Sequence, residues 1–555
     1  MNLLAKRGGF RHHVRMVTPA FSDCINKLGV DEKDVIPFGR NKAKISLDVL
    51  DKPAAPGKLI LVSAITPTPS GEGKTTVSIG LAQGLQAIGK KVCLALRQPS
   101  MGPVFGRKGG ATGGGKSSLT PAEEINMHFT GDFHAITSAH NLISAIIDNA
   151  MFFHTLNIDE RKVIWKRVMD MNDRSLRSII VGLNKQGFPR ETGFDITPAS
   201  EIMACLCLAT SYKDMEERIN RIVIGFTTDD KPVFARELGI TGSVMALLKD
   251  ALMPNLVQSV EGVPCFLHGG PFANIAHGCN SAIATRLSLK LADYVVTEAG
   301  FGADLGAEKF LDIKCRYAGL HPAAVVLVAT VRALKSHGGV AKPDLGKPNA
   351  EAVRAGSVNL TRHIENLQGF GLPVCVAINA FPTDTAEEMD VIYDVCSKAG
   401  VPCALSEVFA KGGEGGKALA ETVLSILDDS AEVQYTYELD APLTDKIEAV
   451  ATKIYRAGRV SYTAAAKKTL DELTALGYGK LPVCIAKTQY SFSDNAKLTG
   501  APTGFTMEVR EVRLAAGAGF VVVICGNIMT MPGLPKKPAA VNIDVDAEGK
   551  ITGLF

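Results

Sequence analysis

The most informative segment of this 555-residue sequence for its fold is Thr68-Pro-Ser-Gly-Glu-Gly-Lys-Thr75. It stands between an apolar run at residues 59–65, which predicts a strand, and residues 75–88, whose apolar side chains recur at helical spacing. Glycines there let backbone N–H groups point inward, and the helix start adds partial positive charge. Lys74 can reach terminal phosphates and the Thr75 hydroxyl can bind Mg²⁺. The sequence therefore predicts an ATP phosphate loop built from Thr68, Pro69, Ser70, Gly71, Glu72, Gly73, Lys74 and Thr75.

One position of this loop departs from the general motif GxxxxGK[ST]. Thr68 stands where the first glycine is expected, and Pro67 and Pro69 restrict the backbone on either side of it. The alternative is a glycine-rich turn with a purely structural role. The order of strand, loop, lysine and helix favours phosphate binding over that alternative.

Positive charge gathers in the sequence after the loop. No acidic residue intervenes between Glu72 and Glu123, a stretch that carries seven lysines and arginines. A site for a polyanion accounts for both features. Arg97 directly follows the predicted strand at residues 92–96, so we expect it to face the same crevice, where a planar guanidinium can bind carboxylate or phosphate oxygens. A solvated surface arginine is the alternative.

Short runs rich in valine and isoleucine recur between helical patterns along the chain, and such runs predict buried parallel strands. We therefore expect an α/β protein with a large doubly wound parallel sheet in a phosphate-loop domain and two smaller α/β domains. The expected domains are residues 1–348, with a basic N-terminal extension at residues 1–22, then residues 349–439 and residues 440–555. The expected strands are residues 59–65, 92–96, 179–181, 222–226, 294–296, 324–329, 374–378, 483–486 and 520–524.

Polar residues or glycines follow several of these runs. In an open doubly wound sheet the carboxyl ends of the strands line the ligand crevice, so such residues are candidates for the site. The plainer alternative is that polar residues simply begin loops. The candidates selected by position are Arg97, Glu298, Asn379, Lys487 and Gly526.

The amino-acid composition indicates which classes of partner the protein does not require and which cellular compartment suits it. With 60 basic and 57 acidic side chains the formal net charge is +3, which requires neither nucleic acid nor a membrane as a partner. The 12 cysteines lie mostly in apolar surroundings without zinc spacing, which indicates reduced core residues in the cytoplasm. The first 22 residues contain basic but no acidic side chains, as organelle transit peptides do, so organellar targeting is the less favoured alternative.

Six longer motifs follow one another along the chain: residues 66–75 (TPTPSGEGKT), 97–106 (RQPSMGPVFG), 128–136 (HFTGDFHAI), 268–280 (HGGPFANIAHGCN), 297–306 (TEAGFGADLG) and 406–416 (SEVFAKGGEGG). Together they resemble the formate–tetrahydrofolate ligase family. The resemblance implies an enzyme (EC 6.3.4.3) that uses ATP and Mg²⁺ to join formate to tetrahydrofolate through formyl phosphate, giving 10-formyltetrahydrofolate, ADP and phosphate for one-carbon metabolism. It also implies a homotetramer in which Lys74 and Arg97 are catalytic and Arg97 holds formyl phosphate.

The same resemblance implies that Phe381 and Phe409 form a slot for the pterin ring of folate. The family commonly has tryptophan at the second position, so Phe409 offers a smaller face; two core phenylalanines are the alternative. Gln98 stands where many members carry glutamate, which places a monovalent cation site for K⁺ or NH₄⁺ in doubt. Lys116 replaces a usual tyrosine and adds positive charge near the crevice.

A few other polar residues are candidates for contacts with phosphate or Mg²⁺. His128 and Asp132 share one short segment, for which a hydrogen-bonded structural loop is the alternative. Glu298 is a candidate to support a metal ion. His268 and His277 flank a glycine-rich turn, and we interpret them as structural.

Two other functions fit parts of the sequence. The segment at residues 70–75 also resembles phosphate-loop switch ATPases that act through a protein or membrane partner. An inactive scaffold that keeps the fold is the third interpretation, because Gln98 and Phe409 depart from the common choices.

Overall fold

The computed structural model describes residues 17–69, 71–108 and 110–554. Residues 1–16, which make up most of the predicted basic extension, lie outside the described residues, as does Ser70 of the phosphate loop. The described part begins with helix α2 (Pro19–Leu28), which Thr18 caps through its hydroxyl.

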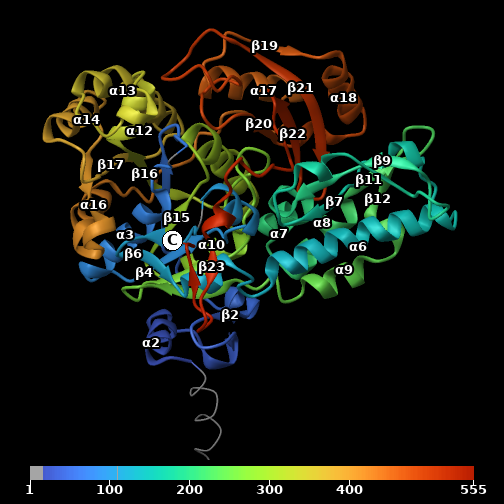
Figure 1. Cartoon of the computed structure of the whole chain (residues 1–555), viewed down its shortest axis with the longest axis horizontal. Helices are drawn as coiled ribbons and strands as arrows, with labels where there is room; N and C mark the ends of the chain where they lie inside the picture. Colours follow the sequence, from blue (N-terminus) through green and yellow to red (C-terminus); the bar gives the residue numbers. More distant parts are fainter. Residues whose placement is uncertain (1–16, 70, 109, 555) are drawn as a thin grey trace, which may run out of the picture.

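A 12-stranded sheet forms the centre of the molecule (Figure 1). Seven strands, in the order β14-β4-β15-β3-β16-β17-β18, are parallel to their neighbours, and β13, β2 and β1 extend one edge in antiparallel fashion. The protein is thus an α/β protein with one large, mostly parallel sheet and several smaller ones. The bounds are β1 (Val35–Pro37), β2 (Ala43–Ile45), β13 (Asn255–Ser259), β14 (Pro264–Leu267), β4 (Val92–Leu96), β15 (Tyr294–Glu298), β3 (Lys58–Ala64), β16 (Pro322–Ala329), β17 (Val374–Asn379) and β18 (Cys403–Ser406). The two remaining strands, β5 (Gly113–Gly114) and β6 (Ser117–Thr120), pair with each other, and β6 also pairs with β13.

Helices cover both faces of the parallel strands. Successive side chains of a strand point to opposite faces, and in these strands both sets are apolar, so each face needs a cover. On one face α3 (Lys74–Ala87) and α16 (Gly413–Ile426) pack against β3 and β16. On the other face α12 (Val331–His337), α13 (Ala350–Gly369) and α14 (Ala386–Lys398) complete the core.

Two of the expected parallel strands are hairpin strands instead. β8 (Ile179–Val181) pairs antiparallel with β9 (Arg190–Thr192), and β11 (Val223–Phe226) pairs antiparallel with β12 (Pro232–Phe234). Ile180, in the middle of β8, is 64% exposed. The prediction of parallel strands at residues 179–181 and 222–226 is therefore wrong, because so short an apolar run does not distinguish a hairpin from a central strand. Residues 222–225 are buried as predicted, whereas residues 179–181 are not.

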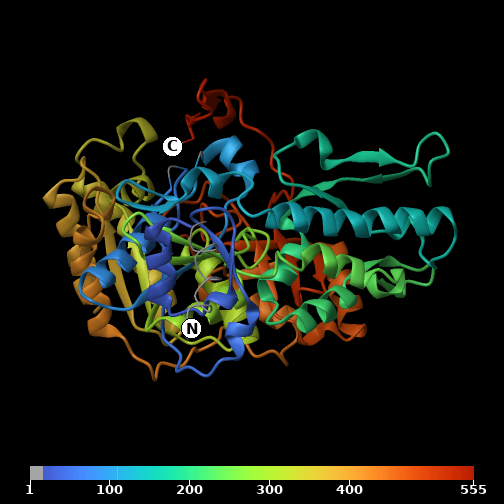
Figure 2. The ribbon, with the colours of Figure 1, turned by 90° about the horizontal axis from the view of Figure 1, so that it is seen from below.

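A helical lobe extends from the sheet beside these hairpins (Figure 2). Its longest helix, α6 (Asp132–Phe152), lies beside α9 (Thr241–Leu248), and both pack with α7 (Glu201–Leu208) and α8 (Tyr212–Arg221) around a separate apolar core. The lobe brings Asp132, at the first turn of α6, to the edge of the main sheet.

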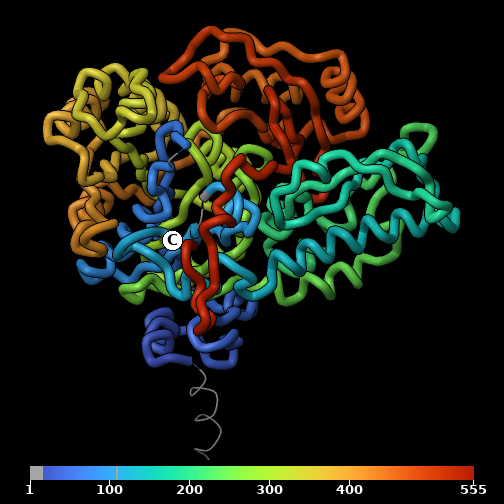
Figure 3. The backbone as a smooth tube through the Cα atoms, in the orientation of Figure 1, coloured from blue at the N-terminus to red at the C-terminus, as the bar shows by residue number. Residues whose placement is uncertain are grey.

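The C-terminal part of the chain forms a second sheet of four strands, in the order β19-β21-β22-β20 (Figure 1), and Figure 3 traces its backbone in orange and red. β17 and β18 are hydrogen-bonded into the main sheet, although they come from the predicted second domain, and the boundaries near residues 348 and 439 stay predictions. The bounds are α17 (Leu443–Ala449), β19 (Arg459–Tyr462), α18 (Ala464–Ala475), β20 (Val483–Ala486), β21 (Thr506–Ala515) and β22 (Phe520–Cys525).

Across the described ranges, no helix is both long and apolar enough to cross a membrane.

Candidate nucleotide and substrate site

The predicted phosphate loop occupies the position that its motif requires. It leaves the carboxyl end of β3 and enters α3, whose first residue is Lys74. Gly71 and Gly73 have φ values of +77° and +73°, a backbone region that other residues rarely adopt. The glycines therefore allow the turn by which backbone N–H groups face a ligand at the helix N-terminus.

Glu72 explains why threonine replaces the expected first glycine. Its carboxylate accepts hydrogen bonds from the backbone N–H of Thr68 at 2.7 Å and from the Thr68 hydroxyl at 2.9 Å. The hydroxyl of Thr330, which directly follows β16, donates to the other carboxylate oxygen. Glu72 is only 3% exposed. The loop is thus closed by a side chain, and the position of Thr68 uses a hydroxyl that glycine lacks.

Asn379 holds the second half of the loop. This last residue of β17 donates from Nδ2 to the Glu72 carbonyl oxygen at 3.0 Å. A Cβ added to Gly73 would lie 2.4 Å from the same Nδ2 atom, so only glycine leaves room for this contact. The prediction that Asn379 lies at the crevice is consistent with this contact.

Glu298 meets the phosphate loop from the neighbouring strand. It is the last residue of β15 and 5% exposed, and its Oε2 accepts a hydrogen bond from the Thr75 hydroxyl at 2.9 Å. A carboxylate and a hydroxyl at the start of a phosphate-binding helix are the oxygen donors that Mg²⁺ takes beside nucleotide phosphates. In the described ranges no group of three or more His, Cys, Asp or Glu could bind a metal ion by itself, so phosphate oxygens would complete such a site.

Arg97 directly follows β4, the strand on the other side of β15. Its Nη1 donates to the Pro271 carbonyl oxygen at 3.3 Å. A Cβ on Gly300 would lie 2.8 Å from the same atom, so the guanidinium lies against the backbone that continues from Glu298. The buried Nε of Arg97 has no hydrogen-bond partner among the described residues, which leaves a donor for a ligand oxygen.

Gln98, next to Arg97, is 4% exposed and is held by its backbone. Its N–H donates to the Gly269 carbonyl oxygen at 2.7 Å, while its side-chain Oε1 has no partner within the described ranges. The side chain is uncharged, so this position offers a cation one neutral oxygen where glutamate would offer a carboxylate.

Phe381 and Phe409 come from the ends of neighbouring strands. Phe381 lies two residues beyond β17, and the Arg332 guanidinium carbon lies 3.6 Å from the centre of its ring. Phe409 lies in the short helix α15 (Val408–Lys411) after β18 and is 60% exposed. Its carbonyl oxygen accepts from the Lys116 N–H at 2.9 Å. An exposed ring of this size is available to a ligand.

Asp132 makes the contacts expected of the structural interpretation. This residue, 2% exposed, bonds the Lys44 ammonium at 2.8 Å and the Asn255 amide at 2.6 Å. The same ammonium also donates to the Asn255 side-chain oxygen and the Met253 carbonyl. His128 is exposed. A carboxylate already neutralised by a buried lysine is poorly suited to bind phosphate-bound Mg²⁺.

His268 and His277 are both fully buried. His268 bonds the Ser281 hydroxyl at 2.7 Å and the Ala251 carbonyl oxygen at 2.6 Å. Burial lowers the pKa of His268 to about 4 and the pKa of His277 to about 3. Both rings are therefore neutral at physiological pH, which agrees with their structural interpretation.

Sequence reasoning missed some residues that contact the loop. The strand-end rule could have found Thr330, because this residue directly follows β16. No local signal could have found Asn359 and His363, because α13 brings them to Thr66 from almost 300 positions away in the sequence.

Comparisons with known proteins agree with this geometry. A family model described as formate–tetrahydrofolate ligase matches residues 15–555. The curated formate–tetrahydrofolate ligase of Paracoccus denitrificans (strain Pd 1222) is 57% identical over 534 residues, which cover 95% of this chain and 96% of that protein. The resemblance carried by the six sequence motifs is confirmed. The chain belongs to the formate–tetrahydrofolate ligase family.

Proposed function

We propose that the phosphate loop, Arg97 and Glu298 carry out the first half of the family's reaction at the carboxyl end of the main sheet. The loop binds the phosphates of ATP through backbone N–H groups and Lys74, and Thr75 with Glu298 holds Mg²⁺. The bound ion neutralises phosphate charge. A formate oxygen attacks the γ-phosphorus, the bond to the bridging oxygen breaks, and ADP leaves, with positioning and electrostatics supplying most of the rate.

The second half transfers the formyl group. The N10 lone pair of tetrahydrofolate attacks the formyl carbon, the bond from that carbon to the phosphate oxygen breaks, and N10 loses its proton. Arg97 holds formyl phosphate during both steps. Its unpaired Nε and its position beside β15 support this role, since a guanidinium keeps its charge while phosphate departs.

Phe381 and Phe409 bind the pterin ring in this proposal. The exposed face of Phe409 supports stacking, and the Arg332 guanidinium holds the Phe381 ring from one side. Stacking of this kind contributes about 1 kcal/mol beyond the area buried.

The observation that carries the proposal is the hydrogen bond from Thr75 to Glu298, because it joins the phosphate loop to the strand beside Arg97. Purified protein should release ADP only when formate is present, and should accumulate 10-formyltetrahydrofolate when tetrahydrofolate is added. Hydrolysis that is independent of formate, without a formylated product, would contradict the proposal and favour a switch ATPase.

Several finer properties are part of the same proposal. The parallel strands are doubly wound, the enzyme is a cytoplasmic homotetramer, and no nucleic acid or membrane takes part. Buried cysteines support a reducing compartment, and light scattering measures the oligomer. Because Gln98 lacks a charge, we expect K⁺ or NH₄⁺ to stimulate this enzyme only weakly. A tenfold loss of activity in Na⁺ buffers would show that another group holds the cation.

A further inference from the structure

The phosphate loop is tied to the C-terminal sheet through its first residues. Thr66 stands between β3 and the loop and is fully buried. Residues 487–500, which we name the 487–500 segment, lead from β20 of the C-terminal sheet toward β21 and end at Gly500. Two side chains from the other face of the main sheet lie between Thr66 and Gly500.

Asn359 and His337 bridge all four backbone polar groups of these two residues. Asn359, on α13, accepts from the Thr66 N–H at 3.1 Å and donates to the Gly500 carbonyl oxygen at 2.6 Å. His337, at the end of α12, bonds the Thr66 carbonyl oxygen through Nε2 at 2.9 Å and accepts from the Gly500 N–H through Nδ1 at 3.2 Å. Each of the two side chains is therefore hydrogen-bonded to both Thr66 and Gly500.

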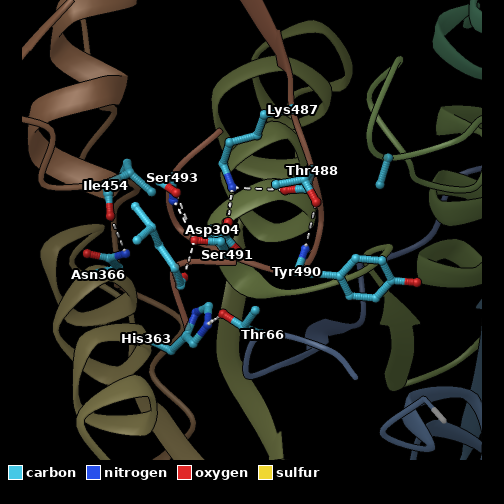
Figure 4. Close-up of polar contacts among 12 residues, drawn as sticks. Thr66, Asp304, His363, Asn366, Ile454, Lys487, Thr488, Tyr490, Ser491 and Ser493 are labelled. Atoms are coloured by element: carbon cyan, nitrogen blue, oxygen red, sulfur yellow. Dashed lines mark hydrogen bonds and ion pairs between the residues drawn. The ribbon is translucent and has the colours of Figure 1, made fainter. Parts of the chain in front are cut away.

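The Thr66 side chain is held by the same helix. Its hydroxyl accepts from Asn359 Nδ2 at 3.0 Å. The hydroxyl also pairs with His363 Nε2 at 2.9 Å, as the close-up shows (Figure 4). Every polar group of Thr66 therefore has a partner from α12 or α13. The backbone two residues before the phosphate loop is thus held in one position.

A buried ion pair anchors the other end of the 487–500 segment. Lys487 bonds Asp304 at 2.8 Å, and neither side chain is exposed (Figure 4). Lys487 also donates to the carbonyl oxygens of Thr488 and Ser491, so the backbone that directly follows it is held in place. Asp304 lies six residues after Glu298. The segment is thus joined to the entrance of the phosphate loop through Asn359 and His337, and it directly contacts the chain that follows the proposed Mg²⁺ residue.

We propose that the 487–500 segment of the C-terminal sheet positions the phosphate loop for phosphoryl transfer, and that His337 and Asn359 are the positioning residues through which it acts. The proposal rests on the proposed binding of ATP phosphates by the loop. Neither side chain touches a reacting atom; each fixes the backbone from which Thr68, Glu72 and Lys74 follow. A loop held at its start keeps its N–H groups aimed at one point, and misplacement by a fraction of an ångström weakens phosphoryl transfer.

Three single variants of the full chain test this role. His337→Gln keeps a nitrogen donor for Thr66 but removes the ring nitrogen Nδ1 that accepts from the Gly500 N–H. Asn359→Ala removes the second bridge. Asn366→Ala is the matched control, because Asn366 lies on the same helix and donates to the Ile454 carbonyl oxygen of the C-terminal part without contacting Thr66 (Figure 4).

The assay is formate-dependent release of ADP, with KM measured separately for ATP, formate and tetrahydrofolate, together with the melting temperature. We expect His337→Gln to raise the KM for ATP about three- to tenfold and Asn359→Ala to raise it more, with the KM for tetrahydrofolate within twofold of wild type. Asn366→Ala should lower the melting temperature and leave the KM for ATP unchanged.

Two results would overturn the proposal: an unchanged KM for ATP in His337→Gln, or an equal rise in Asn366→Ala. His337 is only half-buried and its glutamine variant keeps the contact with Thr66, so this variant decides the question even if Asn359→Ala fails to fold. Wild-type protein that releases no ADP with formate would instead contradict the proposed function.

Discussion

Replacing Glu72 by alanine should weaken phosphoryl transfer far more than it weakens the fold. The change removes the acceptor for the Thr68 N–H, the Thr68 hydroxyl and the Thr330 hydroxyl. Thr68 is half-buried and water can reach it, whereas Thr330 is 1% exposed. The loop then loses its closure while β3 and α3 keep their apolar contacts with the core.

The magnitude follows from these three hydrogen bonds. A hydrogen bond to a charged group contributes about 1.5–3 kcal/mol, and water replaces part of the loss at Thr68. Restoring the closed loop in the alanine variant should cost about 2–3 kcal/mol, which corresponds to a fall of roughly 30- to 150-fold in kcat/KM for ATP. Glu72→Gln keeps an acceptor for Thr68 and should lose about fivefold, because the charge is missing and an amide nitrogen replaces the oxygen that accepts from the Thr330 hydroxyl.

Formate-dependent ADP release measured against ATP concentration gives these ratios, and urea unfolding gives the stability. Glu387→Ala, at an exposed position of α14, is the control. If Glu72→Ala kept the kcat/KM of wild type, the carboxylate would not hold the loop. If Glu72→Gln lost as much as Glu72→Ala, the charge itself and not the geometry of the loop would matter, and the reasoning would be refuted.

Three other changes test the rest of the site. Lys74→Ala should lower kcat by at least about 100-fold and leave the affinity for tetrahydrofolate nearly intact in calorimetry; equal loss of both would indicate misfolding. Phe409→Trp should lower the KM for tetrahydrofolate and Phe409→Ala should raise it about fivefold, while an unchanged KM in both would argue against the folate slot. Burial raises the pKa of Glu201 to about 7, so the folded state retains a proton that the unfolded state releases near pH 4.5, and stability should fall as pH rises between these values. Between pH 5 and 8 wild type should lose about 2 kcal/mol in urea unfolding relative to Glu201→Gln, and parallel pH profiles would contradict this.

Features that depend on the local order of residues along the chain could be predicted from the sequence. Strand, glycine loop, lysine and helix are consecutive between residues 58 and 87, so their spacing alone located the phosphate loop. The strand-end rule placed Arg97, Glu298 and Asn379 at one edge of the main sheet, because parallel strands bring their carboxyl ends together. It was wrong for Lys487 and Gly526, which follow β20 and β22 of the separate four-stranded sheet. The ordered motifs indicated the family for the same reason.

Local pattern misjudged short runs whose partners are not adjacent. β13 (Asn255–Ser259) is fully buried although it contains the polar residues Asn255 and Ser259, because Asn255 donates to Asp132 and the Ser259 hydroxyl accepts from the Val263 N–H. The run at β8 is apolar yet exposed in part. Whether a strand is buried depends on what packs against it, and the residues of the strand alone do not show this.

The contacts that hold the phosphate loop are visible only in the folded protein. Glu72 sits four residues after Thr68, but its third partner, Thr330, comes from a strand more than 250 residues away. Thr66 and Gly500 are separated by more than 400 positions and meet through His337 and Asn359. Hydrogen bonds between side chains and distant backbone groups leave no periodicity in a sequence, because each needs one residue of the right reach and no repeating pattern. For that reason the sequence predicted the phosphate loop, whereas the contacts at its start come from the packing of α12, α13 and the C-terminal sheet.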